Sequence, residues 1–349
     1  MDIAGSRNAL YDKIRGVAIV LVVLGHAIQW SYEDMCHVDL FNIIYSFHMP
    51  LFMFISGLVA YKKDRIINYV WLKKKFINLV LPFFSWIFLH FMFDHDYNGG
   101  LISYCFLALK SPDYGYWFLW VLFLLCTVTY VSAIIANGLK IKHSEIITIF
   151  ILVVIYLGYS CLNIRYLGIP LLLRHAKYYF AGYYMRKYKD TIKRYVLLLG
   201  VVCGLTWIFT VHFWRFLGDY PFVPDLHRFL ACIVNEDGFI FTTLYTGSIL
   251  VYNIMIAFGG IAIIFAVVSL ADKWIGSTKI DVAFNFLGKH TIEIYILHLF
   301  FLNIMHASND LIQVMINLVI ALGIPVLIIF CIQNNRIYLL LFGKKDQYL

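Results

Sequence analysis

Charged side chains are scarce in this sequence of 349 residues. They make up 14% of it and hydrophobic residues make up 62%, whereas an average soluble domain carries about 25% charged residues. This shortage argues against a water-soluble fold. Apolar runs recur along the whole chain, separated only by short charged or Pro/Gly-marked connections, so its core must face lipid as well as itself.

Cysteine pairs of the CxxC kind are absent. The seven cysteines are scattered and odd in number, so neither a disulfide framework nor a zinc site is predicted, and we expect no metal. The chain also lacks a basic face with interleaved aromatics, so its net charge of +8 does not indicate nucleic-acid binding. Residues 1–14 are polar and no small-residue cleavage site follows the first apolar run, so we expect no removable leader.

Apolar runs of spanning length predict an all-α, polytopic membrane protein with about ten helices of about 17 to 25 residues. The predicted spans are 14–32, 41–60, 76–93, 115–136, 145–161, 170–186, 195–213, 245–270, 284–303 and 311–333. An even count places both termini on one side, together with the basic connections, and the positive-inside rule makes that side cytoplasmic. Without an internal repeat or an appended soluble domain, residues 1–349 are predicted to form a single membrane domain.

The first predicted helix carries ionisable groups at membrane depth. Arg15 and His26 are eleven residues apart, so they share one helix face and lie roughly 16 Å apart along its axis. Gln29 and Glu33 continue this polar stripe. An intramembrane histidine indicates a functional site by default, and a helix–helix hydrogen bond is the plain alternative. The stripe favours function.

Four segments follow one another in a characteristic order. They are Arg15 with His26, Phe47-His48-Met49-Pro50 with Ser56-Gly57, Tyr116-Trp117-Phe118-Leu119, and Gly288-Lys289 with Tyr295 and His298. Together they resemble the acyltransferase-3 family of membrane O-acyltransferases, including its fucose 4-O-acetylase-like branch. Lys75 and Asn78 stand where the family often has two arginines before Pro82-Phe83, so the bidentate phosphate geometry of arginine is lost there.

The resemblance implies an O-acyltransferase, in the usual case an O-acetyltransferase, in the inner membrane of a bacterium. Its donor substrate would be acyl-CoA, usually acetyl-CoA, from the cytoplasm, with no permanently bound cofactor, and its acceptor a cell-surface or lipid-linked carbohydrate. Arg15, Lys73, Lys74 and Lys75 are predicted to attract the CoA phosphates. His26 is predicted to be the base at the acceptor hydroxyl. Direct transfer and an acyl-imidazole intermediate both remain open.

Other side chains receive supporting roles, each with an alternative. Ser56, Tyr295 and His298 are candidate donors to the thioester oxygen, although Ser56-Gly57 also fits small-residue helix packing. Glu33 is a candidate to orient His26. Each candidate acceptor-binding residue also has a structural alternative: a helix–helix hydrogen bond for the histidine, the interfacial aromatic belt for the tryptophan, and snorkelling for the two cations. The candidate acceptor-binding residues are His48, Trp117, Arg174 and Lys177.

Two other classes of protein also fit a polar stripe in a membrane helix. A transporter or flippase of a polysaccharide pathway uses intramembrane charges as substrate sites or proton relays, and the absence of an evident repeat weakens that reading. A non-catalytic scaffold predicts that the side chains of Arg15 and His26 are dispensable. Beyond the acetyl group that is usual in the family, the sequence favours no particular acyl chain, and it favours no particular sugar or oligomeric state.

Overall fold

The computed structural model describes residues 9–63, 65–94, 97–110, 116–216, 223–234, 238–275, 278–333 and 337–343, and no strand occurs among them. The helices are α1 (Ala9–Gln29), η1 (Met35–His37), α2 (Asp39–Ala60), α3 (Tyr69–Phe93), α4 (Leu101–Lys110), α5 (Trp117–Gly138), α6 (Ser144–Cys161), α7 (Ile169–Lys187), α8 (Lys189–Thr210), η3 (Val211–Phe213), α9 (Val223–Ala231), α10 (Phe239–Ile275), α11 (Lys279–Lys289), α12 (Thr291–Leu297), η4 (His298–Phe301), α13 (Asp310–Ile332) and α14 (Ile337–Phe342).

Seven of the described helical stretches are long and apolar enough to cross a membrane. They are Asp39–Ala60, Tyr69–Phe93, Trp117–Gly138, Ser144–Cys161, Arg194–Phe213, Phe239–Trp274 and Asp310–Ile332. Many of their large apolar side chains are exposed, such as Leu197 and Phe209 on α8, as expected where a helix faces lipid. The chain is thus an all-α, multi-pass membrane protein, as predicted. The number of ten spans and the side of the termini stay predictions.

Each predicted span overlaps a helix, but the ninth, over 284–303, is not one helix, and that prediction is wrong. The backbone N–H of His290 donates to the carbonyls of Phe286 and Leu287, which ends α11. α12 then begins at Thr291, and the chain tightens into η4 at His298. Hydropathy does not detect this break because apolar residues lie on both sides of it.

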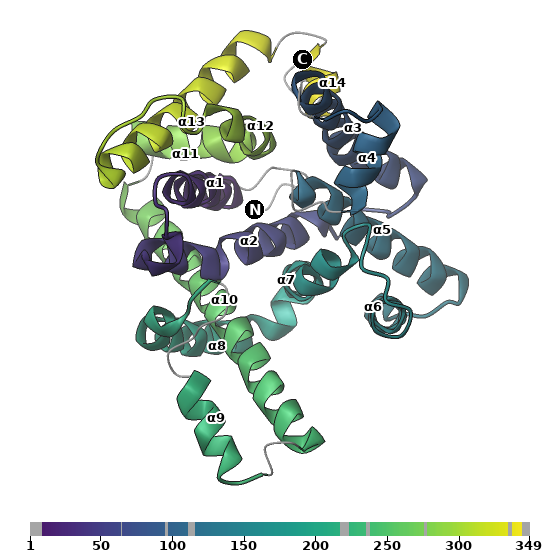
Figure 1. Cartoon of the computed structure of the whole chain (residues 1–349). Coiled ribbons are helices and arrows are strands. Elements are labelled where there is room, and N and C mark those ends of the chain that lie inside the picture. The colour runs from purple at the N-terminus through teal and green to yellow at the C-terminus, as the bar shows by residue number, and fades with distance from the viewer. Residues whose placement is uncertain are drawn as a thin grey trace. The chain divides into compact units, whose positions relative to one another are not determined.

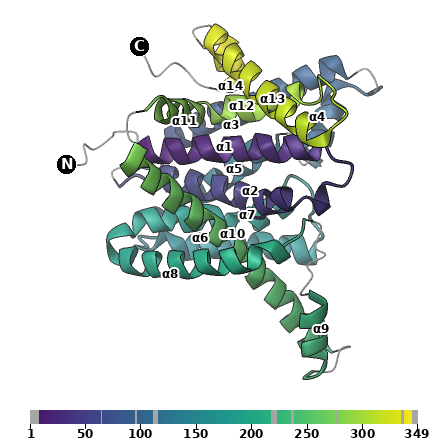
Figure 2. The ribbon, with the colours of Figure 1, turned by 90° about the vertical axis from the view of Figure 1, so that its left-hand side faces the viewer.

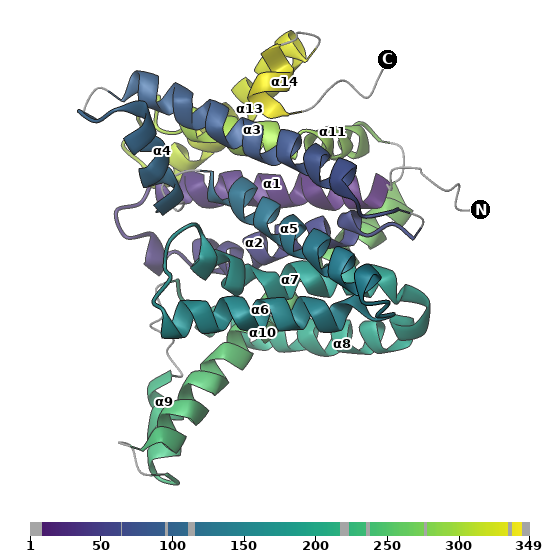
Figure 3. The ribbon, with the colours of Figure 1, turned by 90° about the vertical axis from the view of Figure 1, so that its right-hand side faces the viewer.

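The chain divides into two compact units, one of residues 1–55 and 188–326 and the other of residues 56–187 and 327–349. In the first unit, α1 lies between α11 with α12 on one side and α10 on the other (Figures 1 and 2). In the second unit, α5 lies between α3 and the pair α6 and α7 (Figure 3), and α14 packs on α3. There, Trp86 Nε1 donates to the carbonyl of Leu341 at 2.7 Å.

Two glycines let α1 and α11 approach backbone to backbone. A Cβ on Gly16 would collide with the carbonyl of Phe284, and one on Gly288 with the carbonyl of Asp12. Small residues are how membrane helices achieve such contact, since lipid provides no hydrophobic force between them. Beside the contact, Lys13 pairs with Asp272 of α10 and Asp281 of α11. α1 is therefore held on two sides near its start.

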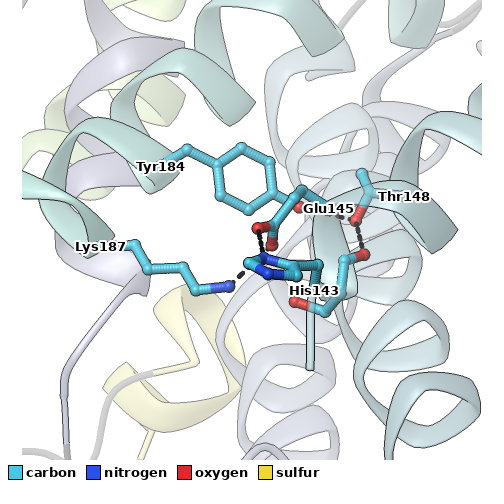
Figure 4. Close-up of polar contacts among 6 residues, drawn as sticks. His143, Glu145, Thr148, Tyr184 and Lys187 are labelled. Carbon is cyan, nitrogen blue, oxygen red and sulfur yellow. Dashed lines mark hydrogen bonds and ion pairs between the residues drawn. The ribbon is translucent and has the colours of Figure 1, made fainter. Parts of the chain in front are cut away.

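The second unit is tied together at one end by a polar cluster between α6 and α7 (Figure 4). Lys187 Nζ donates to Glu145 at 2.7 Å, and His143 Nδ1 lies 2.9 Å from the same carboxylate. Thr148 and Tyr184 share a hydrogen bond of 2.7 Å. These bonds link the start of α6 to the end of α7.

Candidate active site

His26 lies in the last turn of α1, where two polar side chains hold one edge of its ring. Its Nδ1 is 3.0 Å from Gln29 Oε1, and Tyr45 OH donates to that same oxygen at 2.8 Å. Because an amide oxygen only accepts hydrogen bonds, the bond to Gln29 places the proton on His26 Nδ1. The neutral ring then carries its lone pair on Nε2, the nitrogen that can take a proton from a substrate.

Two more histidines surround His26, one from α2 and one from η4. The ring centroids of His26 and His298 are 5.2 Å apart, with the planes tilted by 39°. The Tyr45 ring lies 6.3 Å from that of His26 and 4.6 Å from that of His48. His48 and His298 are buried, with 4% and 0% of their surface exposed. We call His26, His48 and His298 the histidine cluster.

All members of the histidine cluster use the same ring nitrogen for a local hydrogen bond. His48 Nδ1 is 2.8 Å from the carbonyl of Ile44, and His298 Nδ1 is 3.0 Å from that of Ile294. Because carbonyl oxygens accept, both Nδ1 atoms donate, and each neutral ring presents Nε2 as an acceptor. This tautomer argues against the predicted role of His298, because a donor to the thioester oxygen needs a proton on Nε2.

Acceptor nitrogens from three histidines also raise the question of a metal. Among the residues that the structure describes, no three His, Cys, Asp or Glu side chains are placed to share a metal ion. The chemistry of the cluster, as described, is that of bases and hydrogen-bond acceptors. Tyr295, the other predicted donor of this region, is buried, and its ring lies 6.0 Å from that of His298.

Arg15 lies on the same continuous helix as His26, nearer its start, with 22% of its side chain exposed. Its guanidinium is 3.6 Å from the carboxylate of Asp12, which is itself buried. This carboxylate offsets part of the positive charge that the sequence pattern assigned to phosphate binding. The sequence-based prediction for Arg15 did not include this contact with Asp12.

The predicted donor-binding lysines lie in the first turns of α3, in the second unit. Lys73 and Lys74 are exposed, whereas Lys75 is half-buried with Nζ 5.6 Å from the centroid of the Trp71 ring. Asn78 lies on the next turn and is also half-buried. The two lysines that stay exposed are therefore the more accessible to an anion.

More cations of the second unit lie close to these lysines. Burial lowers the pKa of Lys62, and the nearby charges of Arg65, Lys74 and Arg186 lower it further. Like charges act on each other in this way only within a few ångströms to a Debye length. The connection before α3, the start of α3 and the end of α7 thus form one basic region, of which the sequence pattern predicted only the lysines on α3.

The predicted acceptor-binding residues of α5 and α7 all lie in the second unit. Trp117 stacks on His175, with ring centroids 5.0 Å apart and planes at 24°. Lys177 Nζ donates to the carbonyl of Arg174 at 3.0 Å. Arg174 itself is exposed.

Ser56 lies on the part of α2 that belongs to the second unit and is half-buried. A Cβ on its neighbour Gly57 would collide with the carbonyl of Tyr179 on α7. Close helix packing therefore accounts for this glycine, whereas the donor role of Ser56 stays a prediction.

Comparison with known proteins adds to this geometry. The family model described as an acyltransferase domain, acyltransferase 3, matches residues 8–333. The chain belongs to the acyltransferase-3 family. It is 30% identical over 134 residues to the nodulation protein NolL of Sinorhizobium fredii and 28% identical over 134 residues to NolL of Mesorhizobium japonicum. Each match covers 34% of this chain and 34% of the relative. No solved structure matches the chain significantly.

In this member of the acyltransferase-3 family, the histidine cluster draws on three of the four segments that carry the family resemblance. His26 comes from the first segment, His48 from the second and His298 from the last. Residues far apart in the sequence thus meet at the ring of His26, which has the rings of Tyr45 and His298 as neighbours. The pattern of a polar tyrosine three residues before His48, in an otherwise apolar run, was the available signal for Tyr45.

Glu33 does not lie where the helical stripe predicted. α1 ends at Gln29, and Glu33 lies beyond it in an exposed turn. The side chain of Ser31 donates to the carbonyl of Ala27 at 2.7 Å, which closes the last turn. The residue bound to His26 is therefore Gln29, which the pattern included in the stripe without assigning it a role.

Proposed function

We propose that this acyltransferase moves an acyl group, usually acetyl, from cytoplasmic acyl-CoA to a hydroxyl of a cell-surface or lipid-linked carbohydrate. Membership of the family and the membrane-spanning helices support an acyltransferase in a cell membrane, and the two matched relatives come from bacteria, which favours the bacterial inner membrane. The observation that carries the proposal is the hydrogen bond between His26 Nδ1 and Gln29 Oε1, which leaves Nε2 of the neutral ring with a lone pair that can act as the base.

The proposed reaction uses His26 Nε2 as the base. It takes the proton of the acceptor hydroxyl while the hydroxyl oxygen attacks the thioester carbonyl carbon, and the carbon–sulfur bond breaks to release a thiolate. The imidazolium then returns the proton to that sulfur, giving free CoA and the acylated sugar. Gln29 and Tyr45 keep Nδ1 protonated throughout, as a carboxylate does for histidine in hydrolase triads. An attack of Nε2 itself on the thioester is the alternative order.

On the donor side, the proposal assigns the CoA phosphates to cations at the cytoplasmic rim. Lys73 and Lys74 offer exposed ammonium groups, which bind phosphate as point charges. Arg15 contributes a guanidinium that shares its charge with Asp12. Because Lys75 is half-buried beside Trp71, we assign it a smaller part in phosphate binding.

The test is acyl transfer by the purified full chain in detergent, with labelled acetyl-CoA and a panel of methyl glycosides. Wild type should acylate a glycoside, and His26→Ala should reduce the rate by about 10²- to 10⁴-fold. His143→Ala, just before α6, is the matched control because this histidine is mostly exposed, and it should keep the wild-type rate. Glycan O-acyl content in cells that lack the chain, complemented with each variant, gives the same comparison in vivo. Full rescue by His26→Ala would refute the mechanism, and a chain that moves substrates without transferring acyl groups would be a transporter.

A further inference from the structure

His298 has a buried nitrogen that the proposed reaction does not use. The residue is fully buried, and its Nδ1 donates to the carbonyl of Ile294. Its Nε2 is therefore a lone pair, and among the described residues this atom has no hydrogen-bond partner. Leaving a buried acceptor unsatisfied is unfavourable. Such an atom in a candidate active site indicates a ligand that donates a hydrogen bond.

The neighbour of this nitrogen defines the kind of donor. The His26 ring lies 5.2 Å from the His298 ring, centroid to centroid, and both neutral rings present Nε2 as an acceptor. An anion does not suit two adjacent acceptors, because it brings no hydrogen to share. Two hydroxyl groups do, since each donates one hydrogen bond of about 2.8 Å. With the rings this close, hydroxyls on adjacent carbons fit the pair.

We propose that His298 Nε2 accepts a hydrogen bond from the hydroxyl next to the one that His26 deprotonates, so that the enzyme recognises its acceptor as a vicinal diol. This inference rests on the proposed function and adds the acceptor class. His298 gains no proton in the reaction. It orients the second hydroxyl, which stays unacylated, and thereby selects which oxygen of the sugar faces His26. His298 is in this respect a specificity-determining residue.

A hydrogen-bond network connects the segments that carry His26 and His298. Asn317 of α13 accepts from the backbone N–H of Asn303, just after η4, at 2.9 Å. Its amide nitrogen donates to Ser31 Oγ at 3.1 Å, and Ser31 in turn donates to the carbonyl of Ala27, next to His26. Gln313 joins the network through Asn317 at 3.2 Å. The segment that carries His298 is thus connected to the turn that carries His26.

The experiment measures kcat/KM on a methyl glycoside that wild type acylates and on its monodeoxy analogue, which lacks the neighbouring hydroxyl. Wild type should lose about tenfold on the deoxy acceptor. His298→Ala should lose about the same factor on the parent glycoside and nothing more on the deoxy one. His298→Gln, whose amide oxygen can still accept, should recover part of the preference. Thermal unfolding in detergent confirms that both variants fold.

Four outcomes distinguish a failure of this inference from a failure of the proposed function. Equal kcat/KM of wild type on both acceptors would overturn the role of His298 while leaving acyl transfer intact. A His298→Ala variant that still prefers the parent glycoside to the deoxy one as strongly as wild type would also overturn the role of His298. The product in cells gives an independent check by NMR, because an acylated carbon without a free hydroxyl on either neighbouring carbon would contradict a vicinal diol. Absence of transfer by wild type to any glycoside would refute the proposed function, and the inference with it.

Discussion

Gln29 is the residue whose removal tests the tautomer of His26 most directly. Its Oε1 receives hydrogen bonds from His26 Nδ1 at 3.0 Å and from Tyr45 OH at 2.8 Å. Leucine at position 29 keeps much of the side-chain volume and removes the acceptor. His26 can then carry its proton on either nitrogen, and the fraction of rings with a lone pair on Nε2 falls. The rate of acyl transfer should fall with it.

The expected loss in kcat depends on how exposed Gln29 is and on whether Tyr45 can take its place as the hydrogen-bond partner of His26. A typical intramolecular hydrogen bond contributes about 0.5–1.5 kcal/mol, and Gln29 is exposed, so the lower half of that range applies. Tyr45 OH is 3.5 Å from His26 Nδ1 and can partly replace the lost acceptor. Gln29→Leu should therefore lower kcat about two- to fivefold. Gln29→Leu combined with Tyr45→Phe removes both partners and should lower it about tenfold or more.

The assay is steady-state transfer from labelled acetyl-CoA, read as kcat and KM separately in a double-mutant cycle. Loss in kcat with little change in the KM for acetyl-CoA is expected, because Nδ1 bonds Gln29 and takes no part in binding the donor in the proposed reaction. Tyr45→Phe alone should behave like Gln29→Leu or more mildly. Wild-type kcat in the double variant would refute the claim that these side chains hold the tautomer.

Three further predictions concern packing, donor binding and the polar network. Gly288→Ala should lower the free energy of unfolding, measured in detergent, by about 1–3 kcal/mol. Gly323→Ala is the control and should change it little, because its new Cβ meets nothing within 4 Å. Equal losses in the two variants would contradict the close contact of α1 and α11. Lys74→Ala should raise the KM for acetyl-CoA about two- to fivefold and leave the KM for the acceptor unchanged, with the exposed Lys110→Ala at the end of α4 as control. An effect on the KM for the acceptor alone would be evidence against a donor site. Asn317→Leu removes the acceptor of the Asn303 N–H and the amide that donates to Ser31 Oγ, so kcat and the free energy of unfolding should both fall, the latter by about 1–3 kcal/mol. An unaltered kcat in the destabilised variant would separate the network from the site.

The fold class was predictable from the sequence because lipid imposes a simple length rule. About 20 apolar residues are needed to span the hydrocarbon, and each predicted run in this chain overlaps a helix, although the ninth is broken into shorter ones. The ends of the helices were less predictable. α1 stops at Gln29 and the ninth predicted span breaks at His290, because backbone and side-chain hydrogen bonds decide helix ends and hydropathy does not report them.

The candidate site was predictable only where one helix carries it. The spacing of Arg15 and His26 on one helix follows from helical geometry, and α1 is continuous through both. The partners of these residues come from elsewhere. Tyr45 reaches His26 from α2, and His298 reaches it from η4, through contacts that no local pattern contains. The Asp12 carboxylate beside Arg15 was local, and helical spacing of three residues was a usable signal for it.

The glycines beside the charged motif residues give the resemblance a physical meaning. Gly16 follows Arg15, Gly288 precedes Lys289, and each glycine accommodates a carbonyl of the other helix. Arg15-Gly16 and Gly288-Lys289 therefore lie on the two sides of one interface, that between α1 and α11. Because this interface sets the rotation of α1 against α11, and α12 follows α11 after a single residue, it also sets how His26 meets His298. Segments that the sequence marks as catalytic therefore also contain the glycines that position the catalytic side chains. Replacing Gly16 or Gly288 should disturb the histidine cluster although neither glycine belongs to it.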